Sequence, residues 1–188
     1  PGVWEIEIPL EKIQHEDLYK LMVFWPGGNG ERIPAYARRI VQDSQTKIFS
    51  AQVWNPPETY NWKYAKLKKP VSHPIIYETH IGMAQEDEKI STYNEFREKT
   101  LPRIIQAGYN TIQFMGILEH PYYGSFGYHV SSFFAASSRF GTPEELKELI
   151  DECHKYGLSV IIDLVHSHSV KNEIEGLSRF DGTPYQYF

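Results

Sequence analysis

Cysteine is almost absent from this sequence, which also lacks long apolar runs and any excess of positive charge. The single Cys153 excludes a disulfide within the chain and suits the reducing cytoplasm, where we expect the protein to reside. No apolar run approaches the roughly 20 residues that a membrane span requires. The formal net charge of -5 disfavours nucleic acid as a partner, because nucleic acids bind to basic surfaces. We therefore expect neither a membrane nor a nucleic acid as partner.

The chain is also too short for a complete (β/α)₈ barrel, since it has 188 residues and such a barrel takes about 250. It opens with Pro1-Gly2-Val3-Trp4, which has no signal-peptide character, so we expect it to be cut from a longer protein. Aromatic residues, in contrast, are abundant at 14%. An aromatic content this high is typical of proteins whose rings stack on sugars or bases, or of proteins with a large aromatic core.

Residues 1–62 have the short strands and the glycine-proline turns of the end of a β-sandwich. The predicted strands cover 3–8, 18–25, 39–42 and 48–53. The run Pro26-Gly27-Gly28-Asn29-Gly30 predicts the turn after the second strand. Residues 63–74 are rich in lysine and contain prolines, which predicts a linker. A basic nucleic-acid patch is the alternative, and the acidic remainder of the chain opposes it.

From residue 75 the pattern changes to alternating strands and helices. The predicted strands cover 75–80, 110–118 and 158–165, and the predicted helices cover 92–107 and 142–157. Capping boxes begin both helices, at Thr92 with Glu95 and at Thr142 with Glu145. Pro102 should kink or split the first helix. The third strand is almost continuously apolar, which is typical of parallel strands buried on both faces. This order predicts an α/β fold in which 75–188 are the start of a (β/α)₈ barrel, with about three strands.

Acidic residues and histidines gather where the three predicted strands end, within 78–82, 119–129 and 163–168. Because ligands bind at the carboxyl ends of parallel strands, we expect a site there. Asp163 interrupts an apolar strand, and a buried carboxylate must be paired, so structural pairing and lining of a site are both open interpretations. His166 and His168 are two residues apart and would face the same way on a strand. Zinc binding, a hydrogen bond to a ligand hydroxyl and a bond to the backbone all remain open, and the second is favoured.

The loop within 119–129 is rich in rings and glycine. Its aromatic residues are Tyr122, Tyr123, Phe126 and Tyr128. They could present flat faces and hydroxyls to a sugar, or they could simply anchor a packed loop. The two glycines do not form a phosphate loop, because no Lys-Ser or Lys-Thr pair follows them.

Segments at all three strand ends resemble the α-amylase superfamily, namely 77–82, 119–128 and 163–168. The runs 131–146 and 180–183 are similar, within that superfamily, to the 1,4-α-glucan (glycogen) branching enzymes. The resemblance implies a retaining glycosyltransferase that cleaves α-1,4-glucan and transfers the segment to a 6-hydroxyl, as in glycogen biosynthesis. It also implies that 1–62 end a β-sandwich carbohydrate-binding module and that 75–188 begin the catalytic barrel.

Substrate-binding roles for five residues follow from the same resemblance. Asp163 and His168 match the first conserved region of the superfamily, in which the His hydrogen-bonds the glucose at the cleavage point and the Asp organises the site. Tyr128 matches the Tyr that stacks on that sugar. Glu119 and His120 lie where the branching-enzyme loop faces the groove, so we expect them to support substrate binding.

The resemblance places the catalytic carboxylates outside this chain. In the family, an Asp nucleophile ends the fourth barrel strand and a Glu acid/base ends the fifth, so we expect both beyond Phe188 and expect the chain alone to be inactive. Ser167 replaces the Asn that binds Ca²⁺ in amylases, so neither a metal nor another cofactor is expected. The alternatives are an α-amylase-type hydrolase or debranching enzyme, a non-catalytic glucan-binding module and a metal-dependent hydrolase.

Overall fold

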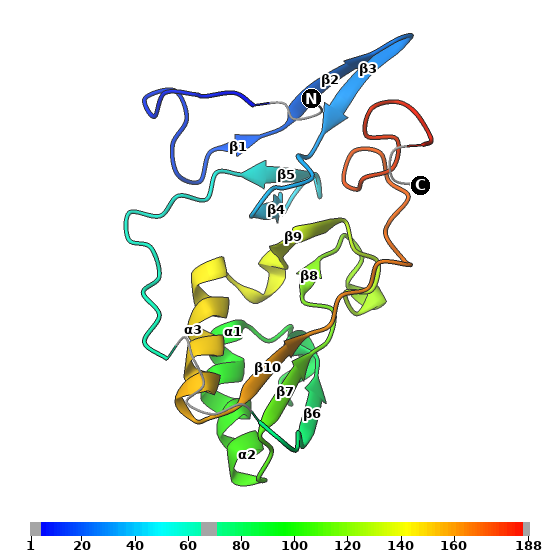
Figure 1. Ribbon diagram of the computed structural model, residues 1–188. Helices are drawn as coiled ribbons and strands as arrows, with labels where there is room; N and C mark the ends of the chain where they lie inside the picture. The colour runs from blue at the N-terminus through cyan, green and yellow to red at the C-terminus, as the bar shows by residue number, and fades with distance from the viewer. Residues whose placement is uncertain (1–4, 65–70, 186–188) are drawn as a thin grey trace.

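The computed structural model describes residues 5–64 and 71–185. An all-β region contains β1 (Leu18–Tyr19), β2 (Leu21–Trp25), β3 (Gly28–Arg32), β4 (Ile40–Gln42) and β5 (Phe49–Gln52). An α/β region contains β6 (Ile76–Thr79), α1 (Tyr93–Glu95), α2 (Leu101–Gln106), β7 (Thr111–Phe114), β8 (Leu118–Glu119), β9 (Ser132–Ala136), α3 (Pro143–Lys155) and β10 (Ser159–Ile162). Short helical turns are η1 (Ile81–Met83), η2 (Phe96–Thr100), η3 (Tyr123–Ser125) and η4 (Ser138–Phe140). The all-β region lies at one end of the molecule, above β9 and α3 (Figure 1).

In the all-β region, β1, β5 and β4 form an antiparallel sheet and β2 pairs with β3 in a hairpin. The hairpin turn occupies only residues 26–27, with Gly27 at φ +92°, so the predicted turn over 26–30 is too long. Gly28 lies in β3 beside the ring of Trp25, and a Cβ there would lie 2.9 Å from Trp25 Nε1. Gly28 is needed in this strand because the Trp25 ring lies so close to it. In the sequence, such a strand glycine cannot be distinguished from a turn glycine.

The predicted strand over 3–8 is wrong where the structure describes it. Residues 5–8 pair with no strand of the described chain, and Ile6 is 79% exposed. Alternation of apolar and polar residues specifies a strand only where a surface buries the apolar side. The other predicted strands of this part are confirmed in shorter form as β1 with β2, β4 and β5, and residues 3 and 4 lie outside the described residues.

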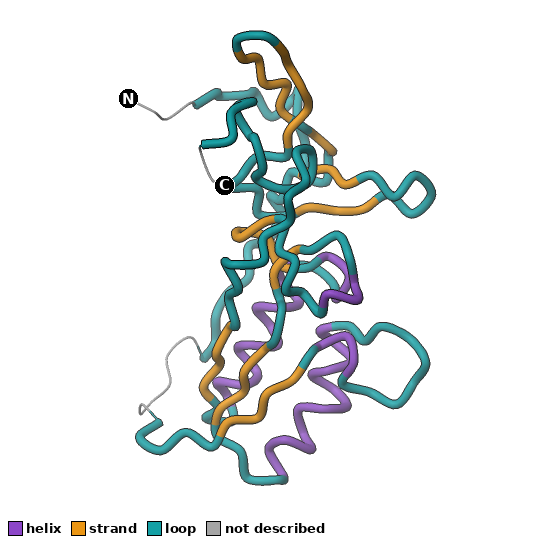
Figure 2. The backbone as a smooth tube through the Cα atoms, turned by 90° about the vertical axis from the view of Figure 1, so that its right-hand side faces the viewer, coloured by secondary structure: helices purple, strands orange, loops and turns teal. Residues whose placement is uncertain are grey.

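In the α/β region, β10, β7 and β6 form a parallel sheet in that order, with the helices on one of its faces (Figures 1 and 2). Parallel neighbours need crossover connections, and a helical segment lies between β6 and β7 and again between β7 and β10. The predicted α/β class is therefore confirmed. After β7, β8 and β9 form a separate antiparallel pair.

The helices begin as their capping boxes predict. In both boxes the threonine hydroxyl accepts the backbone N–H of the glutamate at 3.2 Å, and the glutamate carboxylate accepts the backbone N–H of the threonine. The first predicted helix is split, because α1 runs into the π-helical turn η2 before α2 begins with Pro102 in its first turn. Proline cannot donate to the preceding turn and crowds it, which the wider π turn accommodates.

The face of the parallel sheet that contacts the helices forms the larger core. Ile112 and Phe114 of β7 are completely buried, and so are Phe96 and Leu149 from the helical layer. The rings of Phe96 and Phe114 meet edge to face with centroids 5.6 Å apart, a favourable arrangement for aromatic pairs. This packing holds the carboxyl ends of the strands in fixed positions.

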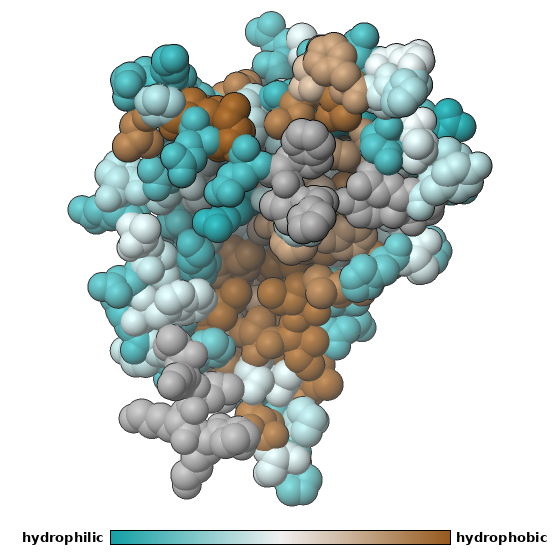
Figure 3. Space-filling view, turned by 45° about the horizontal axis from the view of Figure 1, so that its top comes forward, coloured by the Kyte–Doolittle hydropathy of each residue, from teal (hydrophilic) through white to brown (hydrophobic). Residues whose placement is uncertain are grey.

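The other face of the sheet is open, which corrects one expectation. The third predicted strand was expected to be buried on both faces, but in β10 Ile161 is 38% exposed and Ile162 is 41% exposed. The reason is that β10 is an edge strand of the described sheet and the helices cover only one of its faces. Figure 3 shows the apolar side chains that this leaves at the centre of the molecule.

A second core joins the two regions through β9. Ala135 of β9 is completely buried in a cluster with Ile40, Phe49 and Ala51 of the all-β region. A buried apolar cluster shared by two regions fixes their relative position, because separating them would expose that surface to water.

Arg32, at the end of β3, holds the chain that follows β10. Only 3% of Arg32 is exposed, and its guanidinium donates to the carbonyls of Arg179 at 3.0 Å and Phe180 at 3.2 Å. The same group lies 5.0 Å above the ring of Trp25. Ile33 N donates to the carbonyl of Ile174 at 3.3 Å. The β2–β3 hairpin is thus bound to the chain that follows β10.

Asp151 of α3 anchors the segment that leaves the all-β region. Only 2% of this residue is exposed, and its carboxylate accepts Tyr60 Oη at 2.9 Å, Lys63 N at 2.9 Å and Tyr64 N at 2.7 Å. Burial opposes ionisation of Asp151, but these hydrogen bonds outweigh it and lower its pKa. The start of the predicted linker is therefore fixed to α3, while residues 65–70 lie outside the described residues.

We expect Asp151→Ala to lower the free energy of unfolding by about 3 kcal/mol, because it removes the buried acceptor of three hydrogen bonds, each of which contributes about 1 kcal/mol. Urea unfolding followed by circular dichroism would measure this. Glu152→Ala is the matched control. Among the described residues the side chain of Glu152 makes only a surface ion pair, with Lys155, so its loss should change stability by less than about 1 kcal/mol. Equal effects of the two substitutions would contradict the anchoring role.

Candidate functional site

The carboxyl ends of β6, β7 and β10 lie at one edge of the parallel sheet, and the loop after β8 reaches this edge. Asp163 directly follows β10, and its backbone N–H donates to the carbonyl of Phe114 at 3.1 Å. Tyr128, from the loop after β8, donates its hydroxyl to Asp163 Oδ2 at 3.2 Å. The structure thus brings together two of the predicted site residues, which are 35 positions apart in the sequence.

Both residues of this pair are half-buried, which affects the ionisation of Tyr128. Burial, followed by the negative charge of Asp163, raises the pKa of the Tyr128 hydroxyl. A neutral phenol remains a hydrogen-bond donor at physiological pH. Nearby on the open face of the sheet, Gln113 Nε2 donates to Glu78 Oε1 at 3.1 Å. The edge therefore presents a ring, an amide and two carboxylates, groups suited to a ligand with many hydroxyls.

A close approach of two glycines positions the loop that carries Tyr128. Gly127 has φ +84°, and a Cβ on it would lie 1.9 Å from the carbonyl oxygen of Gly116. Only glycine fits such a contact in the left-handed region. Phe126, with φ +55°, is 44% exposed, and Tyr122 is 64% exposed, so two of the loop's rings face solvent.

Glu119 and His120 lie beneath this loop and have no exposed surface. The carboxylate of Glu119 accepts Ser138 N at 2.7 Å and His120 N at 3.1 Å, and Arg139 lies 3.9 Å away. Burial raises the pKa of Glu119. The Arg139 guanidinium also donates to the carbonyls of His120 and Pro121. Neither side chain therefore faces solvent, and both hold the base of the loop.

His120 and His80 are both buried beside the ring of Phe140, a packing that the sequence did not predict. His120 Nδ1 bonds the carbonyl of Leu118 at 2.8 Å, while its Nε2 has no partner among the described residues. His80, 7% exposed, has no described partner for either ring nitrogen. The ring of Phe140 lies 5.4 Å from that of His80 and 6.3 Å from that of His120. Burial lowers the pKa of both imidazoles, that of His120 to about 4. Both rings therefore pack in neutral form.

The two histidines after β10 occupy different surroundings. β10 ends at Ile162, so the strand alternation that would place His166 and His168 on one side does not extend to them. The ring of His166 stacks on Phe133 with centroids 5.2 Å apart. His168 is exposed, and its Nδ1 shares a hydrogen bond with Ser167 Oγ at 2.7 Å. No described contact joins His168 to Tyr128 or Asp163.

The part of the chain that the structure describes contains no group of three or more Cys, His, Asp or Glu side chains placed to hold a metal ion. Within the same residues, no helix has the length and apolar character needed to cross a membrane.

Comparison with known proteins first gives the class of protein. Residues 99–180 match the alpha amylase catalytic domain. Among solved structures, a putative alpha amylase from Salmonella typhimurium aligns with a TM-score of 0.55 and 26% identity, over 65% of this chain and 21% of that chain. The chain therefore shares an α/β fold with proteins of the amylase type.

More particular relatives match the chain over its whole length. It is 48% identical to the 1,4-alpha-glucan-branching enzyme of Aspergillus oryzae and 49% identical to that of Emericella nidulans. In both cases the match covers 100% of this chain and 28% of the relative. The predicted resemblance to branching enzymes of the α-amylase superfamily is confirmed. The chain spans about 28% of the length of these relatives.

The buried His120 predicts a specific pH dependence of stability. In the unfolded chain this histidine has the ordinary pKa of about 6.5. In the folded chain burial lowers its pKa to about 4, so between pH 4 and 6.5 only the unfolded chain carries the proton. The free energy of unfolding should therefore rise by roughly 3 kcal/mol from pH 4 to 6.5 on account of this group, and not further above that range.

We expect His120→Asn to remove this rise while it keeps a donor for the carbonyl of Leu118. Urea unfolding at several pH values would measure it, with His129→Asn, an exposed histidine of the same loop, as the control. A wild-type slope in His120→Asn would contradict the prediction.

Proposed function

We propose that the chain is part of a 1,4-α-glucan branching enzyme, a retaining glycosyltransferase that cleaves α-1,4-glucan and transfers the segment to a 6-hydroxyl. The observation that carries this proposal is the Tyr128–Asp163 hydrogen bond, at the edge where parallel sheets bind ligands. This pair occurs in a chain that is similar along its whole length to enzymes of that name. We place the reaction in the cytoplasm, which suits the single buried thiol of Cys153.

The domain organisation is part of the same proposal. Residues 1–62 would end a β-sandwich carbohydrate-binding module, 63–74 would connect it, and 75–188 would begin a (β/α)₈ barrel. The parallel order β10-β7-β6, with helices on one face only, supports the barrel. In a barrel, further strands would pair with the open edges of β6 and β10, and closure would cover the face that is open here.

Within this site we assign Tyr128 to stack on the glucose at the cleavage point, with Asp163 orienting its hydroxyl. The described contact of His168 engages only Nδ1, which leaves Nε2 for a sugar hydroxyl. Glu119 and His120 support the site from below, because they hold the base of the loop that carries Tyr128. All five groups act on the substrate by binding or positioning, and none is proposed as nucleophile or acid.

Retaining transfer needs two further carboxylates about 5–5.5 Å apart, one as nucleophile and one as acid and then base. We place both outside these 188 residues, on later strands of the barrel. The present residues would hold one sugar of the donor chain, and transfer rather than hydrolysis would require that water be kept out while a second glucan binds. No metal or cofactor has a part in this scheme.

An α-amylase-type hydrolase or a debranching enzyme is the second candidate, favoured by the structural likeness to a putative alpha amylase. The two activities leave different products from amylose. Branching lowers iodine staining without new reducing ends, whereas cleavage of α-1,4-linkages by a hydrolase releases reducing ends in step with the loss of staining. A debranching enzyme would instead release linear chains from a branched glucan.

Substitution of Tyr128 tests the site directly. We expect Tyr128→Ala, made in a full-length protein that includes the later barrel strands, to lower transfer activity at least about tenfold, because the sugar at the cleavage point loses its stacking partner. The fold should change little, since this ring is only half-buried. Iodine staining and circular dichroism would measure the two effects.

Tyr122→Ala is the matched control, because Tyr122 lies on the same loop and is 64% exposed without a hydrogen bond from its hydroxyl to the described chain. Near-normal transfer by both Tyr128→Ala and His168→Ala would remove these residues from the cleavage site.

A further inference from the structure

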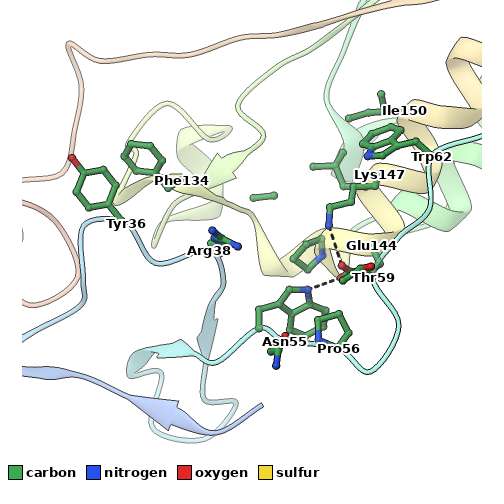
Figure 4. A pocket seen from close by; sticks show the side chains of 14 residues that line it. Tyr36, Arg38, Asn55, Pro56, Thr59, Trp62, Phe134, Glu144, Lys147 and Ile150 are labelled. Atoms are coloured by element: carbon green, nitrogen blue, oxygen red, sulfur yellow. Dashed lines mark hydrogen bonds and ion pairs between the residues drawn. The ribbon is translucent and has the colours of Figure 1, made fainter. Parts of the chain in front are cut away.

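A cavity of about 650 Å³ lies between the all-β region and α3, outside the site described above (Figure 4). Its volume is in the range typical of small-molecule sites, which is roughly 300–1,000 Å³. Side chains from the segment after β5, from β9 and from the first half of α3 line it together with Tyr36 and Arg38, and none of the five proposed substrate-binding residues does. The proposed function leaves this cavity without a role.

Exposed aromatic rings stand on two sides of the cavity. Tyr36 is 74% exposed and Phe134 is 58% exposed, and their ring centroids lie 4.6 Å apart, so they form one continuous apolar platform. Trp62, 41% exposed, lies on the opposite side near Ile150 (Figure 4). Flat rings at these positions can contact the C–H faces of successive pyranose rings.

Uncommitted polar groups lie between the rings. The side chains of Arg38, Asn55 and Thr59 line the cavity, and none of them makes a hydrogen bond or ion pair with another residue that the structure describes. Arg38 is exposed and lies between the two aromatic sides, nearer to Phe134 than to Trp62 (Figure 4). Together these side chains offer donors and acceptors to hydroxyl groups without any change in the surrounding structure.

The wall of the cavity, in contrast, is already fixed. Glu144 accepts Trp54 Nε1 at 2.5 Å and Lys147 Nζ at 3.0 Å, as the dashed lines in Figure 4 show. The guanidinium of Arg39 lies 4.7 Å above the Trp54 ring, and the ring of His15 meets it edge-on at 4.7 Å. Because the side chains of this wall are already held in place, ligand binding would cost them little conformational entropy.

We infer that this cavity is a second glucan-binding site, which holds a linear α-1,4-glucan segment between Trp62 and the Tyr36–Phe134 platform. The identity of the ligand rests on the proposed function, and its chemical class rests on the rings and free donors of the cavity. A purely apolar partner would bury Arg38, Asn55 and Thr59 without hydrogen bonds, which costs free energy. Binding here would keep a long chain attached while another part of it reacts, and so raise its local concentration at the site.

The experiment measures binding and turnover separately in the purified full-length protein, which includes the later barrel strands. Isothermal titration with maltoheptaose should give two sites in the wild type. Trp62→Ala and Arg38→Ala should lose one site or weaken it roughly fivefold to tenfold, the effect of losing one stacking or charged contact. The KM for amylose should rise by a similar factor, while turnover of a maltooligosaccharide too short to reach both sites stays unchanged.

The matched control is Phe24→Ala, because Phe24 is 75% exposed on β2 and does not line the cavity. It should bind maltoheptaose like the wild type. Wild-type stoichiometry and affinity in both Trp62→Ala and Arg38→Ala would overturn the inference. Absence of transfer activity in the full-length protein would overturn the proposed function alone, and the titration would still decide whether the cavity binds glucan.

Discussion

Glu119 is an acidic side chain with no exposed surface, and the position of the loop that carries Tyr128 depends on it. A buried carboxylate is tolerated only when donors surround it, and here the backbone of Ser138, the backbone of His120 and the nearby Arg139 provide them. These donors come from both ends of the β8–β9 excursion. One carboxylate therefore ties the start of the aromatic loop to the turn that leads into α3.

Local features of the fold could be predicted from the sequence, because the groups that specify them are a few residues apart. The capping boxes at Thr92 and Thr142 and the split at Pro102 are of this kind. The docking of residues 60–64 on Asp151 could not be predicted, because it joins segments about 90 residues apart in the sequence. The exposure of β10 depends equally on which neighbours cover it, and its apolar composition carries no information about that.

The candidate site shows the same division. The sequence indicated that the three strand ends carry the residues of a binding site. Tyr128 can reach Asp163 because the parallel strands end at the same edge of the sheet. The sequence could not predict which of these acids and histidines face solvent, because a glutamate at the end of β8 can point either into the protein or out of it. Glu119 points in, as does His120, whose neutral ring packs with His80 around Phe140. The sequence contains no local signal for that packing.

The contact of Arg32 with the carbonyls of Arg179 and Phe180 has a consequence for the long segment that carries His168. The entropic cost of closing a flexible loop grows with its length, so a segment pinned at intervals behaves as several short loops. Val170 and Ile174 provide further backbone attachments along the way, to Val130 and Ile33. The free length on either side of His168 is thereby reduced to a few residues. These attachments, two of which come from the all-β region, thus restrict the conformations that His168 can sample before a ligand binds.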